Sequence, residues 1–221
     1  MILYILGSGL ILGLKHAVEA DHVAALSTIA SQSRSLKKSA RMGASWGLGH
    51  STSLFALGLL ILGLKISIPK NVALSFEIIS GFVLVLLGLN VIRKLISGKL
   101  HRHEHMHEDG QTHSHFHKHG SIRSHIHTHQ SFALGVLHGV AGTGALSVLA
   151  LTSVDSFTEG VLFMIVLSIG TIVGMMTMGA LISLPLKFAG KFANTVGMLA
   201  GLASIFVGSE VVYGIAKILI T

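Results

Sequence analysis

The chain has few charged residues and no cysteine. Only 11% of its 221 residues are charged, whereas an ordinary soluble domain carries about 25%. Hydrophobic residues make up 51% of the chain, and the mean hydropathy is +0.74. This composition excludes a large soluble catalytic domain and indicates a membrane protein with the lipid bilayer as its surroundings.

The absence of cysteine removes disulfides, thiolate metal sites and iron–sulfur clusters. Any metal that the chain binds must therefore be held by nitrogen and oxygen atoms. A formal net charge of +7 could indicate nucleic acid, but in a membrane protein the placement of Lys and Arg reports topology. We therefore expect no nucleic-acid partner.

Apolar stretches separated by polar, glycine or proline residues predict about six transmembrane helices. They cover residues 3–30, 42–64, 72–96, 132–151, 160–184 and 192–220. The segment between the third and fourth helices is too polar to enter lipid, and we expect a disordered loop there. The predicted fold is an all-α polytopic membrane protein, divided into residues 1–96, the loop 97–130 and residues 131–221.

Basic residues predict the orientation of these helices. Twelve of the sixteen Lys and Arg residues fall in the first, third and fifth connections, and three fall on the opposite side. Short cytoplasmic loops are enriched in Lys and Arg. We therefore expect both termini outside and the loop 97–130 in the cytoplasm.

An internal repeat is visible when the chain is shifted by 120 to 122 residues. The aligned pairs include Gly13 with Gly135, His16 with His138, Gly81 with Gly201 and Gly88 with Gly208. Each half holds three predicted helices, and an odd number of spans inverts the second half relative to the first. Inverted repeats are characteristic of secondary transporters; chance matching of glycine-rich helices is the alternative.

Two carboxylates, Glu19 and Asp21, accompany histidines within the first predicted helix. Insertion scales assign about 2.5 to 3.5 kcal/mol to a charged Asp at a helix centre, and such residues are by default candidates for ion pathways. Imidazole and carboxylate together suit a divalent transition metal. A buried polar network that neutralises itself is the alternative. The histidines outside the polar loop all fall in predicted spans: His16, His22, His50 and His138.

Helix geometry limits how this cluster can act. At 100° per residue, His16, Glu19 and His22 share an arc of about 120°, whereas Asp21 points elsewhere. A straight helix cannot direct all four at one ion. We expect either a local break in the helix or an Asp21 that does not bind the ion itself but forms a hydrogen bond to one of its ligands.

Two segments resemble the leading signatures of the nickel/cobalt transporter family: HAVEADH, which starts at His16, and LGHST, which contains His50. The resemblance implies that His16, Asp21 and His22 recognise the metal and that His50 belongs to the next motif. Glu19 stands where the family usually has aspartate. Glutamate keeps the negative charge but has a longer side chain.

The second half is more similar to a shorter branch of this family, related to the H-type urease accessory permeases. There the chain reads HGVAGTGAL from His138, which the repeat places opposite His16. His138 is therefore a further candidate ligand, with a packed polar histidine as the alternative. The resemblance implies Ni²⁺ or Co²⁺ as substrate without an organic cofactor, a prokaryotic inner membrane, and a cytoplasmic metallochaperone of urease or hydrogenase maturation as partner.

The polar loop carries eleven histidines in a mostly alternating pattern. Such a chain favours an accessory metal site that buffers, delivers or senses ions, with a polar spacer as the alternative. The accessory candidates are His101, His103, His105, His107, His113, His115, His117, His119, His125, His127 and His129.

These observations predict a permease that moves Ni²⁺ or Co²⁺ through His16, Asp21, His22 and His50. Glu19 and His138 are secondary candidates. Metal efflux by the same fold, and a membrane sensor or component of a multi-subunit transporter, are the alternatives. We do not expect an enzyme, because histidine-bound iron enzymes need more clustered histidines. Glu77 and Glu210 are interpreted as interfacial carboxylates, with gating or proton coupling as the alternative.

Overall fold

The computed structural model is helical apart from two strands of two residues each. It describes residues 2–31, 35–64, 66, 68–97, 105–106, 112–113, 126–141, 156–188 and 192–220. The helices in these residues are α1 (Ile2–His16), α2 (Ala20–Ala30), α3 (Leu36–Leu64), α4 (Lys70–Ser97), α5 (Ile126–Ala141), α7 (Phe157–Phe188) and α8 (Ala193–Ile220). The strands β1 (His105–Met106) and β2 (Thr112–His113) pair in antiparallel register, with His105 opposite His113.

The described residues contain four helices that are long and apolar enough to cross a membrane, namely α3, α4, most of α7 and most of α8. The pair α1 and α2, bent by 56°, makes a fifth if it is counted as one span. Helix α5 has 16 residues, fewer than the roughly 20 that a span needs. The chain is thus a multi-pass helical membrane protein with four to five candidate spans. The rest of the fourth predicted span, 142–151, lies outside the described residues.

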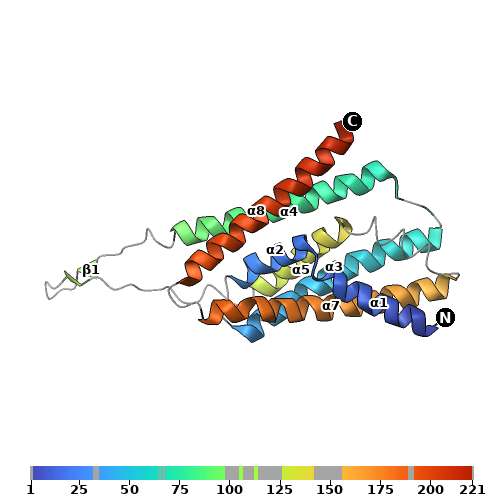
Figure 1. Cartoon of the computed structure of the whole chain (residues 1–221), viewed down its shortest axis with the longest axis horizontal. Helices are drawn as coiled ribbons and strands as arrows, with labels where there is room; N and C mark the ends of the chain where they lie inside the picture. The colour runs from blue at the N-terminus through green and yellow to red at the C-terminus, as the bar shows by residue number, and fades with distance from the viewer. Residues whose placement is uncertain are drawn as a thin grey trace.

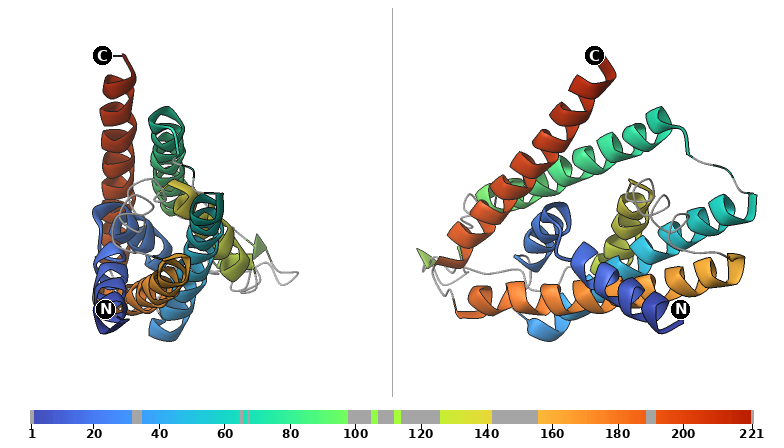
Figure 2. Two further views of the ribbon diagram at one scale, coloured as in Figure 1. Left: turned by 90° about the vertical axis from the view of Figure 1, so that its right-hand side faces the viewer. Right: turned by 45° about the vertical axis from the view of Figure 1, so that its right-hand side comes forward.

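The long helices form two pairs. Helix α3 packs along α7, and α4 packs along α8. Helix α1 lies against α7 and α5 lies against α3. The shorter helices α2 and α5 lie between the two pairs (Figures 1 and 2). At the break between α1 and α2, this arrangement buries His16 and Ala17 and leaves Val18 and Glu19 exposed.

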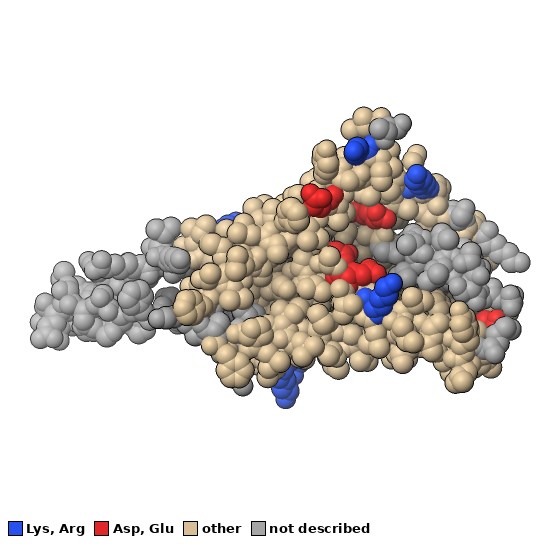
Figure 3. Space-filling view, viewed as in Figure 1, with Lys and Arg blue, Asp and Glu red and all other residues tan. Residues whose placement is uncertain are grey.

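The outer faces of α4 and α8 are apolar. Phe82, Leu86, Leu199 and Phe206 are all more than half exposed. On the face drawn in Figure 3, few of the described side chains are charged. A lipid environment covers such a surface without loss of hydrogen bonds, because the helical backbone satisfies its own polar groups.

Helix α1 crosses α7 at two glycines, Gly13 and Gly170. A methyl group added at Gly13 would collide with the backbone of Leu167 and Thr171. Helix backbones in membranes approach this closely only where residues are small.

Helix α5 crosses α3 in the same manner. A methyl group added at Gly135 would collide with the backbone of Trp46 and His50, and one at Gly49 would meet the backbone of Phe132 and Val136. This crossing holds α5 against the part of α3 that carries His50.

The α4–α8 pair has two glycine contacts. Gly81 lies against the carbonyl of Gly208, and Gly88 lies against the carbonyl of Gly201. The two contacts are made by the same four glycines that the internal repeat aligns.

Replacing Gly13 with alanine should destabilise the protein by about 1 to 3 kcal/mol, because the added methyl overpacks a backbone contact. Gly7→Ala is the matched control on the same helix, since nothing lies within 4 Å of a methyl group there. Thermal unfolding of the detergent-solubilised protein measures both. A Gly13→Ala protein as stable as Gly7→Ala would contradict the close crossing.

Candidate metal site

The chain leaves the helical conformation directly after His16 and resumes it at Ala20. In between, the N–H groups of Val18 and Glu19 donate to the carbonyls of Lys15 and His16, both at 3.1 Å. The turn bends the helix axis by 56°. The structure therefore contains the local helix break that we expected from the sequence as one of two possibilities.

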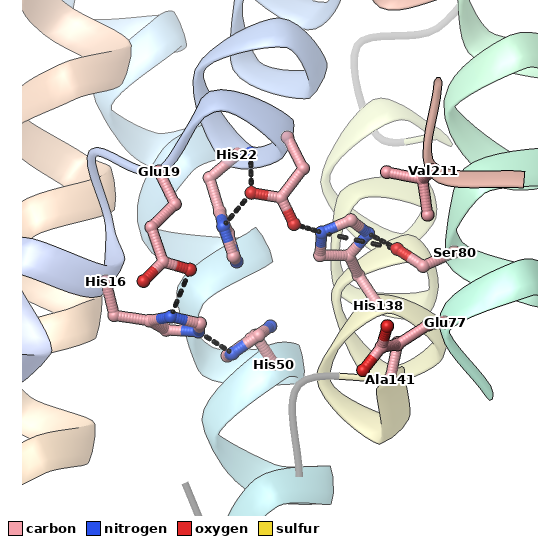
Figure 4. A pocket seen from close by; sticks show the side chains of 10 residues that line it. His16, Glu19, His22, His50, Glu77, Ser80, His138, Ala141 and Val211 are labelled. Atoms are coloured by element: carbon pink, nitrogen blue, oxygen red, sulfur yellow. Dashed lines mark hydrogen bonds and ion pairs between the residues drawn. The ribbon is translucent and has the colours of Figure 1, made fainter. Parts of the chain in front are cut away.

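Four histidine rings converge at this break (Figure 4). The ring centroid of His22 lies 4.5 Å from that of His16, 5.0 Å from that of His50 and 4.8 Å from that of His138. The four side chains come from both sides of the break, from α3 and from α5. All four are buried, with at most 6% of the residue exposed.

Asp21 joins two of these rings. Its Oδ1 accepts hydrogen bonds from Nδ1 of His22 at 2.9 Å and from the backbone N–H of His22 at 2.8 Å. Its Oδ2 accepts from Nε2 of His138 at 2.9 Å. Asp21 also lies in the first turn of α2, where the helix dipole favours a carboxylate.

Glu19 supports a third ring. Its Oε2 lies 2.9 Å from Nδ1 of His16. The side chain of Glu19 is 51% exposed, whereas that of Asp21 is 31% exposed. Carboxylates in this position fix the orientation and tautomer of a histidine and raise its basicity as a metal ligand.

These contacts determine which nitrogens are available. A carboxylate only accepts, so Nδ1 of neutral His16 and neutral His22 carries the proton, and Nε2 carries a lone pair. Nε2 of His16 lies 2.9 Å from Nε2 of His50. Among the described residues, Nε2 of His22 has no hydrogen-bond partner although it is buried. A buried polar atom without a partner is costly, and a metal ion would satisfy it.

The ligand atoms form two groups of three that share His22. One group is His16, His22 and His50, and the other is Asp21, His22 and His138. Within each group the ligand atoms lie within 4.8 Å of one another. A Zn–N bond is about 2.0 to 2.1 Å long, so small side-chain movements would bring either group around a metal ion of similar size.

A cavity of about 260 Å³ opens beside the cluster and is lined by all six predicted site residues. Glu77, Ser80, Ala141 and Val211 complete its wall (Figure 4). Figure 3 shows acidic side chains gathered around a hollow in the surface. Glu77, interpreted from the sequence as interfacial, thus lines the candidate site.

Ser80 is a site residue that the sequence pattern did not predict. Its Oγ lies 2.6 Å from Nδ1 of His138, and it donates there because Nε2–H of His138 donates to Asp21. The signal available in the sequence was a serine next to Gly81 in an apolar segment. Trp46 also packs here, with its ring centroid 5.7 Å from that of His138 in an edge-on arrangement.

The eleven accessory histidines of the polar loop are described only in part. His105 lies in β1, His113 lies in β2, and His127 and His129 lie in α5. The other seven fall outside the described residues. Helix α5 begins at Ile126, within the segment predicted as loop.

Known proteins resemble this chain over most of its length. The family described as the cytochrome c biogenesis protein transmembrane region matches residues 10–209. Urease accessory protein UreH of Bacillus sp. (strain TB-90) is 32% identical over 219 residues, which cover 97% of this chain and 92% of that protein. No solved structure matches.

Two further relatives are similar over shorter stretches. Chloroplast protein FOR GROWTH AND FERTILITY 1 of Arabidopsis thaliana is 29% identical over 170 residues, 76% of this chain and 46% of that protein. Nickel transporter NixA of Staphylococcus aureus (strain NCTC 8325 / PS 47) is 33% identical over 111 residues, 44% of this chain and 32% of that protein. The chain is a multi-pass helical membrane protein.

Ser80→Ala should destabilise the protein by about 1 to 3 kcal/mol, because Nδ1 of His138 would be left buried without its donor. Ser75→Ala is the control on the same helix, since the Ser75 hydroxyl is exposed and donates to the carbonyl of Asn71 within its own helix. Chemical or thermal unfolding compares them. Equal stability of the two variants would show that the hydrogen bond of Ser80 does not stabilise the folded protein.

Proposed function

We propose that this chain is a membrane permease for Ni²⁺. The chain belongs to the family of the cytochrome c biogenesis protein transmembrane region and is a relative of urease accessory protein UreH. The observation that carries the proposal is the convergence of four buried imidazoles and two carboxylates at a break in a membrane helix. The name of NixA, a nickel transporter, favours nickel, and UreH is named as a urease accessory protein. Co²⁺ is the second substrate, implied by the motif that starts at His16.

The donor set suits this substrate. His16, Asp21, His22 and His50 offer imidazole nitrogen and carboxylate oxygen, with Glu19 and His138 adjacent. Imidazole binds Ni²⁺ and Co²⁺ well. Ligands of this kind replace the water shell of the ion step by step inside the bundle.

We propose that residues 1–96 and 131–221 are two inverted three-helix repeats that move against each other. The glycine contacts support this. A shift of 121 to 122 residues turns the contact of Gly13 with Thr171 into that of Gly135 with His50. A shift of 120 turns the contact of Gly81 with Gly208 into that of Gly201 with Gly88. The candidate site lies between the halves, where transporters with inverted repeats bind their substrates.

We propose that both termini face outward and that the segment 97–130 lies in the cytoplasm of a prokaryote. The distribution of Lys and Arg supports this orientation. In Figure 1 the marked chain ends lie toward the right, and β1 extends from the left-hand end. The histidines of this segment would buffer the metal or pass it to a cytoplasmic metallochaperone.

Ni²⁺ flux into liposomes tests the permease. The wild-type protein should transport Ni²⁺ without any other protein. His22→Ala should lower the flux by about 10- to 100-fold, because both ligand groups contain the His22 ring. Deletion of residues 101–119, which leaves α5 intact, should keep the flux. Thr177→Ala, an exposed position on α7, is the control for handling and reconstitution.

Absence of flux in wild type would rule out an autonomous permease and leave the sensor or multi-subunit component. A flux that His22→Ala leaves unchanged would show that the ion does not pass through this site. Growth of cells in limiting and in toxic nickel separates import from export.

A cysteine-labelling experiment tests the orientation, since the chain has no cysteine of its own. Asn71 is exposed at the start of α4, and Ser35 is exposed just before α3. Asn71→Cys should react with a membrane-impermeant maleimide in intact cells. Ser35→Cys should react only after the membrane is opened. The reverse pattern would invert the proposed topology, and labelling of both in intact cells would exclude it.

A further inference from the structure

His22 occupies a special place in the cluster, because both groups of ligand atoms contain it. We call the group His16, His22 and His50 position A, and the group Asp21, His22 and His138 position B. The rings of His50 and His138 are farther from each other, at 6.1 Å, than either is from His22. His50 and His138 therefore approach the ring of His22 from different directions.

Each side of this ring has its own nitrogen. Nδ1 of His22 faces Asp21 at 2.9 Å, which is the side of position B. Nε2 of His22 is buried without a partner among the described residues. In Figure 4 the corresponding end of the ring points toward His50, which is the side of position A.

A neutral imidazole has one lone pair and one N–H group. His22 can therefore ligate an ion through Nε2 in the tautomer described above. Ligation through Nδ1 requires that the proton leave Nδ1 for Nε2 and that the hydrogen bond to Asp21 break, so neutral His22 cannot use both nitrogens at once. Two divalent ions on the two sides of one ring would also repel each other strongly in a buried site. The geometry favours one ion at a time.

The internal repeat gives each position one of two equivalent histidines. His16 belongs to position A, and His138, which the shift of 122 residues places opposite it, belongs to position B. Each of the two is fixed by a polar partner, Glu19 for His16 and Ser80 for His138. Position A is thus formed by residues of the first half alone, whereas position B adds His138 from the second half.

We propose that the transported ion occupies positions A and B alternately and passes between them around His22. This inference rests on the proposed function, and it adds that a complete pathway needs both positions while binding needs only one. His50 serves position A alone, and His138 serves position B alone. These two histidines form a matched pair for the test.

The test uses the chain without residues 101–119 and with the remaining loop histidines His125, His127 and His129 replaced by serine. Ni²⁺ binding is measured by isothermal titration calorimetry in detergent, and flux is measured in liposomes. Wild type should bind one ion per chain. His50→Gln and His138→Gln should each still bind one ion but lose flux by about 10- to 100-fold. The double variant and His22→Ala should lose binding.

Spectroscopy identifies the position that remains. Co²⁺ bound to His50→Gln should show the visible absorption of a site with a carboxylate ligand, and Co²⁺ bound to His138→Gln that of an all-nitrogen site. Size-exclusion elution and thermal unfolding show whether each variant is folded. A variant that does not fold is replaced by His50→Asn or His138→Asn.

Three results would overturn the inference. Loss of binding in either single variant would mean one site that needs all the ligands. Unchanged flux in either variant would place that position off the pathway. Two ions bound per wild-type chain would mean simultaneous occupancy. Failure of the proposed function is a separate result, namely no flux in the wild-type protein. In that case the binding measurements still show whether the ligands form one site or two positions.

Discussion

The pairing of ionisable side chains away from water is the constraint on which the structure of this protein depends. A charge at membrane depth costs several kcal/mol unless it is paired or hydrated. Asp21 is paired by two histidines and one backbone N–H group, and Glu19 by one histidine. The break between His16 and Ala20 lets Asp21 face the same cavity as His16 and Glu19, which a straight helix would not allow. Irregular backbone at this depth is tolerated where it lines a cavity, so the break, the cavity and the ligands form one feature.

Glycine sets the distances that bring these ligands together. In a bilayer, packing and hydrogen bonds between helices replace the hydrophobic effect as the force of association. The crossing of α5 with α3 at Gly135 and Gly49 brings the rings of His138 and His50 to 4.8 Å and 5.0 Å from the ring of His22. A bulkier residue at either glycine would move the helix, and with it a ligand, by more than a metal site tolerates.

Much of the site could be predicted because its residue types are rare in membrane helices. Histidines and carboxylates in apolar segments identified all six cavity-lining candidates, and their angular spacing allowed for the break; their role as metal ligands stays a prediction. Ser80 was missed because a serine in an apolar helix usually serves packing. Six spans were predicted, and the described residues hold four to five candidates; α5 has 16 residues and ends at Ala141, beyond which the fourth predicted span is not described. Which nitrogen bonds which carboxylate follows from tertiary contacts that no local pattern contains.

The position of Trp46 has an optical consequence. It is the only tryptophan in the chain, it is fully buried, and its ring lies edge-on to His138. Indole fluorescence from this protein therefore comes from a single fluorophore that packs against one of the candidate ligands. Its emission and quenching report on the centre of the bundle, without contributions from the loops or the lipid-facing surface.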